Sequence, residues 1–216
     1  LRVETLHILV IGLNHKTAPL EVREKVSYSK AELPSALTLL EERAGEGVIL
    51  STCNRTEVYT VSESPSDAAS RIRDFLADCH GLEPSLFAPH LYARTDVEAV
   101  RHLFRVASGL DSMILGESEI LGQVRSALTA ASETGSLGAP ISRLFHRAIR
   151  TGRRVRDETD VGRNALSVSY AAVGLAQRVL GDLRGLRVLL IGAGDAGHAA
   201  RWRDGLLAAR RLRSGS

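Results

Sequence analysis

Cys53 is the side chain best suited to chemistry. It closes the apolar segment 47–53 and is followed directly by Asn54 and Arg55. A strand end holds a side chain rigidly, and a neighbouring cation such as Arg55 favours the thiolate that attacks a carbonyl carbon. The alternative is a small buried apolar residue, the commoner role of a lone cysteine. Cys79, at the end of a predicted helix, fits that alternative better.

His102 is a second candidate, because histidine can give and take a proton near neutral pH. A helix is expected after Thr95, which forms a capping-box pattern with Glu98. His102 lies roughly opposite the apolar stripe of this helix, which consists of Val97, Val100, Leu103, Phe104 and Ala107. The helix alone therefore predicts an exposed residue, and nothing local brings His102 to Cys53.

Residues 109–123 connect two predicted helices and are rich in glycine and acidic residues. Ser118 and nearby backbone N–H groups would lie at a helix start, where unpaired donors can bind a small polar ligand. An ordinary helix–loop–helix connection is the alternative.

Basic residues gather in the second half of the chain. Residues 1–100 hold 10 Lys/Arg and 15 Asp/Glu, whereas residues 101–216 hold 18 Arg and 10 acidic residues. Six arginines fall within fourteen residues, and four of them share one helix face: Arg143, Arg147, Arg150 and Arg154, with Arg153 and Arg156 close by. This pattern suits phosphate contacts. A solvated helix face is the alternative, and nine aromatic residues give no sign of base stacking.

A glycine pattern, G-x-G-x-x-G at 192–197, follows the apolar segment 185–191 directly. Such glycines allow a tight turn and close approach of the backbone to a pyrophosphate at a helix start. A complete dinucleotide-binding unit also needs a second apolar strand and a residue that reads the ribose. Neither is visible in the arginine-rich residues that follow, so the unit is begun and not finished.

Composition places the chain among globular proteins. Its 216 residues allow one large domain or two small ones, and 44% are hydrophobic. No uncharged run reaches the roughly 20 residues of a membrane helix, and no signal segment opens the chain. Two cysteines cannot form a four-ligand zinc site by themselves, and we expect no metal. We expect a soluble cytoplasmic protein.

Short apolar runs at 6–13, 47–53 and 57–61 predict strands. A helix is predicted from Ser29, which forms a capping-box pattern with Glu32. Further helices are predicted at about 67–77, 118–133, 141–156 and 166–180. This order predicts an α+β fold, a layered sandwich followed by a helical segment.

Together these segments resemble glutamyl-tRNA reductase, the NADPH-dependent first enzyme of tetrapyrrole (porphyrin, heme) synthesis from glutamate. The likeness runs in order from about residue 6 to residue 200. It rests on residues 12–19 (GLNHKTAP), 51–57 (STCNRTE), 102–112 (HLFRVASGLDS), 115–123 (LGESEILGQ) and 191–197 (IGAGDAG).

The resemblance implies that Cys53 attacks the ester carbonyl of glutamyl-tRNA and holds glutamate as a thioester. Hydride from NADPH would then release glutamate-1-semialdehyde. His102 matches a histidine that the family needs for activity, which reverses its helix-based interpretation. The glutamate pocket would be lined by Thr52, Asn54, Arg55, Ser112, Glu117, Ser118, Glu119 and Gln123. The NADPH phosphates would be held by Gly192, Ala193, Gly194, Asp195, Ala196 and Gly197.

The implied architecture is a ferredoxin-like two-layer catalytic domain with a helical segment over residues 1–160, then an incomplete Rossmann-type domain over residues 161–216. Family members continue further and form homodimers through a C-terminal domain that is absent here, so we expect a truncated or frame-shifted chain. The aminomutase that uses glutamate-1-semialdehyde is a possible partner in the family. Glu119 stands where the family usually has Gln, which adds negative charge near an anionic substrate.

Two hypotheses follow. Either the chain is an enzyme that acylates Cys53, acting as a glutamyl-tRNA esterase if NADPH does not bind, or it binds tRNA or a partner through the arginines of 143–156 without turnover.

Overall fold

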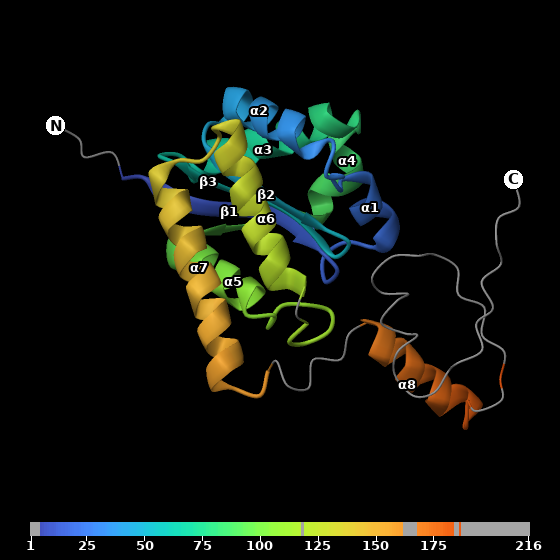
Figure 1. The fold of residues 1–216 in the computed structure, drawn as a ribbon. Helices are drawn as coiled ribbons and strands as arrows, with labels where there is room; N and C mark the ends of the chain where they lie inside the picture. Colours follow the sequence, from blue (N-terminus) through green and yellow to red (C-terminus); the bar gives the residue numbers. More distant parts are fainter. Residues whose placement is uncertain (1–4, 118, 162–167, 184–185, 187–216) are drawn as a thin grey trace, which may run out of the picture.

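A computed structural model describes residues 5–117, 119–161, 168–183 and 186 (Figure 1). Its centre is a four-stranded antiparallel sheet with the strand order β2-β3-β1-β4. The strands are β1 (His7–Asn14), β2 (Gly47–Thr52), β3 (Arg55–Ser62) and β4 (Tyr92–Thr95). This sheet and its helices confirm the α+β prediction.

The described helices connect and follow these strands. They are α1 (Leu20–Lys25), α2 (Leu33–Ala44), α3 (Pro65–His80), α4 (Pro84–Phe87), the 3-10 turn η1 (Ala88–His90), α5 (Asp96–Ala107), α6 (Glu119–Thr134), α7 (Ala139–Glu158) and α8 (Val168–Leu180). None of them combines the length and apolar composition needed to cross a membrane.

Helices cover both faces of the sheet. α2 and α3 pack together on one side, and α5 and α7 pack together on the other (Figure 1). α6 runs beside β2 and contacts both α2 and α7. Because both faces of the sheet are covered, β1 and β3 are buried over nearly their whole length.

The reciprocal bonds predicted between Ser29 and Glu32 form in the turn just before α2, which itself begins at Leu33. The backbone N–H of Ser29 donates to the Glu32 carboxylate at 2.8 Å, and the N–H of Glu32 donates to the Ser29 hydroxyl at 3.3 Å. These are the two reciprocal bonds of a capping box.

The capping box predicted at Thr95 is wrong. Thr95 makes no capping bond through its side chain, and Glu98 pairs with Arg101 instead. Asp96 adopts a positive φ of 49°. Its carboxylate accepts from the His7 ring at 2.7 Å and from the N–H of Ile8 at 3.1 Å. The start of α5 is thus tied to β1 rather than capped locally.

The predicted orientation of α5 is right for Leu103 and Ala107, which are buried, and wrong for Val97 and His102. Val97, placed in the apolar stripe, is 67% exposed, whereas His102 is only 3% exposed. The buried face contains Ala99, His102, Leu103, Val106 and Ala107. A polar ring can lie in this core because it has hydrogen-bond partners, and those partners come from distant strands.

Three short elements, β4, α1 and α4, were not predicted. Each spans six residues or fewer, too short for a periodic pattern to stand out. Apart from Leu186, the predicted strand at 185–191 lies outside the described residues, as does the whole glycine pattern at 192–197.

Gly12 brings β1 unusually close to β3. A Cβ atom at Gly12 would lie 2.3 Å from the carbonyl oxygen of Thr56 and 2.7 Å from the Cα atom of Glu57. It would also lie 3.0 Å from the Glu57 side chain. The missing side chain therefore makes room for Glu57 between the two strands.

Gly12→Ala is expected to lower the free energy of unfolding by at least about 2 kcal/mol, because the backbone of β3 would have to move. Gly122→Ala is the control: nothing lies within 4 Å of its Cβ position on α6, and alanine there should add up to about 1 kcal/mol. Urea denaturation followed by circular dichroism measures both. Equal effects of the two substitutions would contradict the close approach.

Candidate functional site

Cys53 lies in the tight turn between β2 and β3, and its side chain is exposed. The hydroxyl of Thr52 accepts hydrogen bonds from the backbone N–H groups of Asn54 at 3.1 Å and Arg55 at 3.2 Å. The carbonyl of Asn54 accepts from the N–H of His15 at 2.9 Å. Cys53 is therefore presented on a turn whose backbone is fixed from both sides.

Arg23 of α1 provides a cation at this turn. It is 9% exposed, and its guanidinium donates to the carbonyl of Cys53 at 2.7 Å and to the side-chain oxygen of Asn54 at 3.2 Å. The expectation that Arg55 supplies the cation beside the thiol is corrected here, since the Arg55 guanidinium is bound elsewhere. No local signal in the sequence links Arg23 to a turn thirty residues away.

The charges around Cys53 disfavour its thiolate. Partial burial raises the pKa of the Cys53 thiol, and the carboxylates of Glu117 and Glu119 raise it further. Arg23 acts in the opposite direction and is the smaller influence. The loop before α6 and the first turn of α6 therefore place two acidic groups near the thiol, and their role in a glutamate pocket stays a prediction.

Behind the turn, the carboxylate of Glu57 is fully buried and accepts four hydrogen bonds. Arg55 donates at 2.7 Å, Tyr59 at 2.6 Å and Tyr92 at 2.5 Å. The fourth partner is the Nε2 atom of His102, at 2.9 Å. Burial alone would raise the pKa of Glu57, but Arg55 and these hydrogen bonds hold it well below its usual value.

Arg55 extends this network to the loop that follows α5. Its guanidinium is 1% exposed and donates to the carbonyl of Asp111 at 2.7 Å and to its carboxylate at 3.3 Å. Lys16 donates to the other Asp111 oxygen at 2.5 Å. Burial would raise the pKa of Asp111, but the Lys16 hydrogen bond and the Arg55 charge hold it below the usual value. A substrate carboxylate on Arg55 remains a prediction of the resemblance.

His102 is brought into this buried network rather than to the surface. Besides Glu57, its ring lies near Tyr92, with Nε2 3.5 Å from the Tyr92 hydroxyl. The network connects His102 through Glu57 and Arg55 to the strand that begins two residues after Cys53. A direct role of His102 in proton transfer stays a prediction.

Three buried polar atoms around the turn and the loop that binds Arg55 have no hydrogen-bond partner among the described residues. They are the Nε atom of Arg23, the Nδ1 atom of His15 and the hydroxyl of Ser112, the residue after Asp111. Burial lowers the pKa of His15, and the cations of Arg55 and Lys16 lower it further. Unpaired buried polar atoms are costly unless a ligand or water completes them. His15 was not singled out from the sequence.

The other predicted residues fall into two groups. Gln123 lies one turn after Glu119 on α6, so the two share a helix face. The remaining ones lie outside the described part of the chain: Ser118, Gly192, Ala193, Gly194, Asp195, Ala196 and Gly197. Within the described ranges, no group of three or more His, Cys, Asp or Glu side chains could hold a metal ion.

Comparison with known proteins matches this arrangement to one family. A family model described as the N-terminal domain of glutamyl-tRNA(Glu) reductase matches residues 11–159. The chain belongs to the glutamyl-tRNA reductase family. The glutamyl-tRNA reductases of Magnetococcus marinus and Halalkalibacterium halodurans are 49% and 48% identical over 88% and 89% of this chain.

A solved structure of the glutamyl-tRNA reductase from Methanopyrus kandleri aligns over 89% of this chain with a TM-score of 0.62 and 38% identity. The chain spans less than half of these relatives: 46% of the Magnetococcus protein, 42% of the Halalkalibacterium protein and 45% of the Methanopyrus chain. The similarity thus covers the part of the reductase family that contains the Cys53 turn.

Glu57→Gln is expected to lower the free energy of unfolding by about 3–5 kcal/mol, because Arg55 would remain buried without the nearer of its two carboxylates, and only the more distant Asp111 would be left. Because folding lowers the pKa of Glu57, its ionised carboxylate contributes its full stabilisation at pH values above about 4.3, the pKa of glutamate in an unfolded chain. This stabilisation is lost progressively as the pH falls below that value. The difference between wild type and variant should therefore shrink in acid. Urea denaturation at pH 7 and pH 3.5 measures it.

The matched control is Glu98→Gln, which removes an exposed carboxylate paired with Arg101 and should change stability by less than about 0.5 kcal/mol. A Glu57→Gln protein as stable as this control would show that the network is not a stabilising one.

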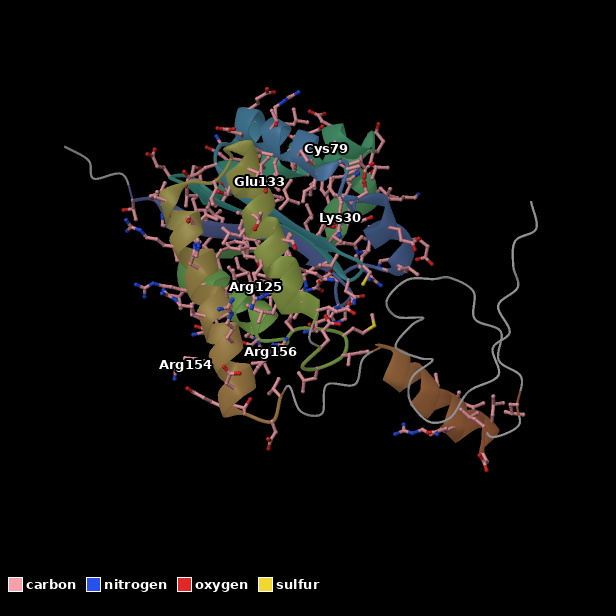
Figure 2. All side chains as sticks on the ribbon, viewed as in Figure 1. Lys30, Cys79, Arg125, Glu133, Arg154 and Arg156 are labelled. Carbon is pink, nitrogen blue, oxygen red and sulfur yellow. The ribbon has the colours of Figure 1, made fainter. Side chains whose placement is uncertain are left out.

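Glu117→Gln and Glu119→Gln should each lower the pKa of the Cys53 thiol, because each substitution removes a carboxylate that raises it. The pH dependence of iodoacetamide alkylation, followed by mass spectrometry, measures the pKa. Cys79→Ser in every protein leaves one thiol. The control is Glu133→Gln, at the other end of α6 (Figure 2), which should leave the pKa of Cys53 unchanged. A similar change of this pKa in all three variants would show that Glu117 and Glu119 do not act on the thiol specifically.

Proposed function

We propose that Cys53 accepts the glutamyl group of glutamyl-tRNA as a thioester, the first half of the reaction for which the relatives are named. The observation that supports it most is the exposed Cys53 thiol on a backbone turn fixed by Thr52, Arg23 and His15. Such a turn holds a nucleophile at a constant position while leaving it open to a bulky ester.

In the proposed step the sulfur of Cys53 attacks the ester carbonyl carbon, and a carbon–sulfur bond forms. The bond from that carbon to the ribose oxygen breaks, and the oxygen leaves with a proton. The thiol must lose its proton before the attack. Because the pKa of Cys53 is raised, little thiolate is present at neutral pH, and a base is needed to take this proton. His102, linked to Glu57, is proposed as the acid–base group.

The substrate itself would ease this requirement. A glutamyl ester carries a free α-ammonium group, whose charge would offset the carboxylates of Glu117 and Glu119. Since those carboxylates raise the pKa of the Cys53 thiol, their neutralisation would lower it when the ester is bound. The acyl group of glutamate is thereby favoured over an acyl group without an ammonium.

The side-chain carboxylate of the glutamyl group needs cations and donors. Lys16, Arg23 and Arg55 lie around the turn, and the carboxylates of Glu57 and Asp111 balance two of their three positive charges. The unpaired atoms of Ser112 and His15 are further candidates for substrate contacts. We assign the carboxylate to this side of the turn, opposite in charge to Glu117 and Glu119.

NADPH, when bound, would supply the hydride that releases the acyl group as an aldehyde. The residues proposed to hold its phosphates, Gly192–Gly197, lie outside the described residues. We also propose the domain division at 160/161, supported by the family match to residues 11–159. The alternation β1-α2-β2-β3-α3-β4 with its strand order supports a ferredoxin-like assignment for the first domain.

The deciding experiment mixes the chain with glutamyl-tRNA that carries labelled glutamate, with and without NADPH, and quenches in acid. Label should remain on the wild-type protein, because a thioester is stable in acid, and on Cys79→Ser. Cys53→Ser should carry none.

The products distinguish the remaining alternatives. Semialdehyde in the presence of NADPH would establish the complete reductase reaction, and free glutamate alone would indicate an esterase. Absence of label together with absence of product would rule out the proposal.

A further inference from the structure

The solvent side of α7 is a row of arginines. Segment 139–156 contains no Asp or Glu, and its exposed positions include the four that we call the α7 arginine face: Arg143, Arg147, Arg150 and Arg154. Arg143 and Arg154 are eleven positions apart, and a helical rise of 1.5 Å per residue spreads these charges along about 16 Å.

Packing fixes this row in place. The opposite side of α7 is buried through Ile141, Leu144, Phe145, Ala148 and Ile149. Gly152 allows a close approach to α5, because a Cβ atom there would lie 2.5 Å from the carbonyl oxygen of Ala107. The helix therefore cannot turn its arginines inward, and the row has a constant orientation.

Most of the charge on this face is not balanced within the described residues. Arg154 pairs with Glu158 at 3.0 Å. Arg143, Arg147 and Arg150 form no ion pair with any part of the chain that the structure describes. Three adjacent guanidinium groups repel one another, and an extended anion removes that repulsion.

The C-terminal half of α7 reaches the candidate site. The guanidinium of Arg156 donates to the carbonyl of Gly116 at 3.2 Å and to that of Glu117 at 2.5 Å. Glu117 influences the pKa of Cys53. Figure 2 shows Arg156 directed toward this loop and Arg154 directed away from the body of the protein. One end of the arginine row is thus next to the loop that borders the nucleophile.

We propose that the α7 arginine face binds backbone phosphates of the RNA whose acyl ester reacts at Cys53. The inference rests on the proposed function, which places an RNA ester at the turn. Planar guanidinium groups match phosphate oxygens with paired hydrogen bonds. A membrane-surface helix would need an exposed apolar side, and that side of α7 is buried.

The test variant is Arg143→Gln, Arg147→Gln and Arg150→Gln combined in the full chain. Binding of glutamyl-tRNA to Cys53→Ser, and to Cys53→Ser with the triple substitution, is measured by fluorescence anisotropy between 50 and about 400 mM salt. Loss of three phosphate contacts should weaken binding roughly 100-fold at 0.1 M salt and reduce the slope of log K against log salt by about 2 to 3.

The matched control removes three exposed cations on the other side of the sheet: Lys30→Gln, Arg43→Gln and Arg73→Gln. Arg43 and Arg73 pair with Asp78 and Asp74, so the control should leave affinity within about threefold. Circular dichroism verifies that both triple variants fold. Equal loss in the two variants would show a general charge effect and overturn the proposal, as would unchanged binding by the α7 variant.

A donor without RNA separates docking from chemistry. Acylation of Cys53 by a glutamate α-thioester, in proteins that retain Cys53, should proceed at the wild-type rate in the α7 variant, since no phosphate is involved. Loss of this acylation as well would show that the substitutions damage the site, and would overturn the docking role.

Two results separate this inference from the proposed function. Arginine-dependent tRNA binding without any acylation of Cys53 would support the docking face and refute the enzyme. Acylation of Cys53 from glutamyl-tRNA at the same rate in wild type and α7 variant would support the enzyme and refute the docking face.

Discussion

The buried carboxylate of Glu57 joins the segments on which the candidate site depends. Its four hydrogen bonds come from β3 itself, from Tyr92 of β4 and from His102 of α5. Arg55, held by Glu57, reaches the loop after α5 through Asp111. A buried charge is tolerated only when it is fully paired, so the positions of β4, α5 and this loop are determined together.

The same constraint explains why the turn can expose a thiol and stay rigid. Arg55 starts β3 two residues after Cys53, and its side chain points into the buried network, where it binds Glu57 and Asp111. The cation on the thiol side is Arg23, which binds the backbone of the turn. Arg23 and Arg55 thus hold the turn from different sides, and neither holds it through the side chain of Cys53.

Much of the central fold is predictable because its signals are local. The apolar runs of β1, β2 and β3, the capping box of α2 and the long helices α6 and α7 follow from patterns within about twenty residues. β4 is an edge strand of four largely exposed residues, so no alternation marks it. Cys53 stood out by its place at a strand end. Arg23 and His15 did not, because their partners lie far away in the sequence, and Glu57 did not, because Tyr92 and His102 complete its network from distant segments.

His102 shows most clearly where local reasoning fails. A helical wheel sorts residues by polarity and assigns a histidine to the solvent side. The wheel contains no information on Glu57, forty-five residues earlier, or on Tyr92 in the preceding strand. Only likeness to the family pointed to the importance of this histidine, and the network supplies a physical reason for its burial.

The electrostatics of the two functional surfaces act in opposite directions. The carboxylates of Glu117 and Glu119 lie near the thiol at the turn, and their negative charges oppose the approach of a polyanion. The α7 arginine face, by contrast, attracts a polyanion. Binding energy gathered at a distance from the reacting atoms can hold an ester in a site that would not retain it by itself. Glu117 and Glu119 then act on the ammonium of the acyl group rather than on the RNA. The α7 arginine face thus attracts the RNA, and the acidic residues beside the thiol select the acyl group.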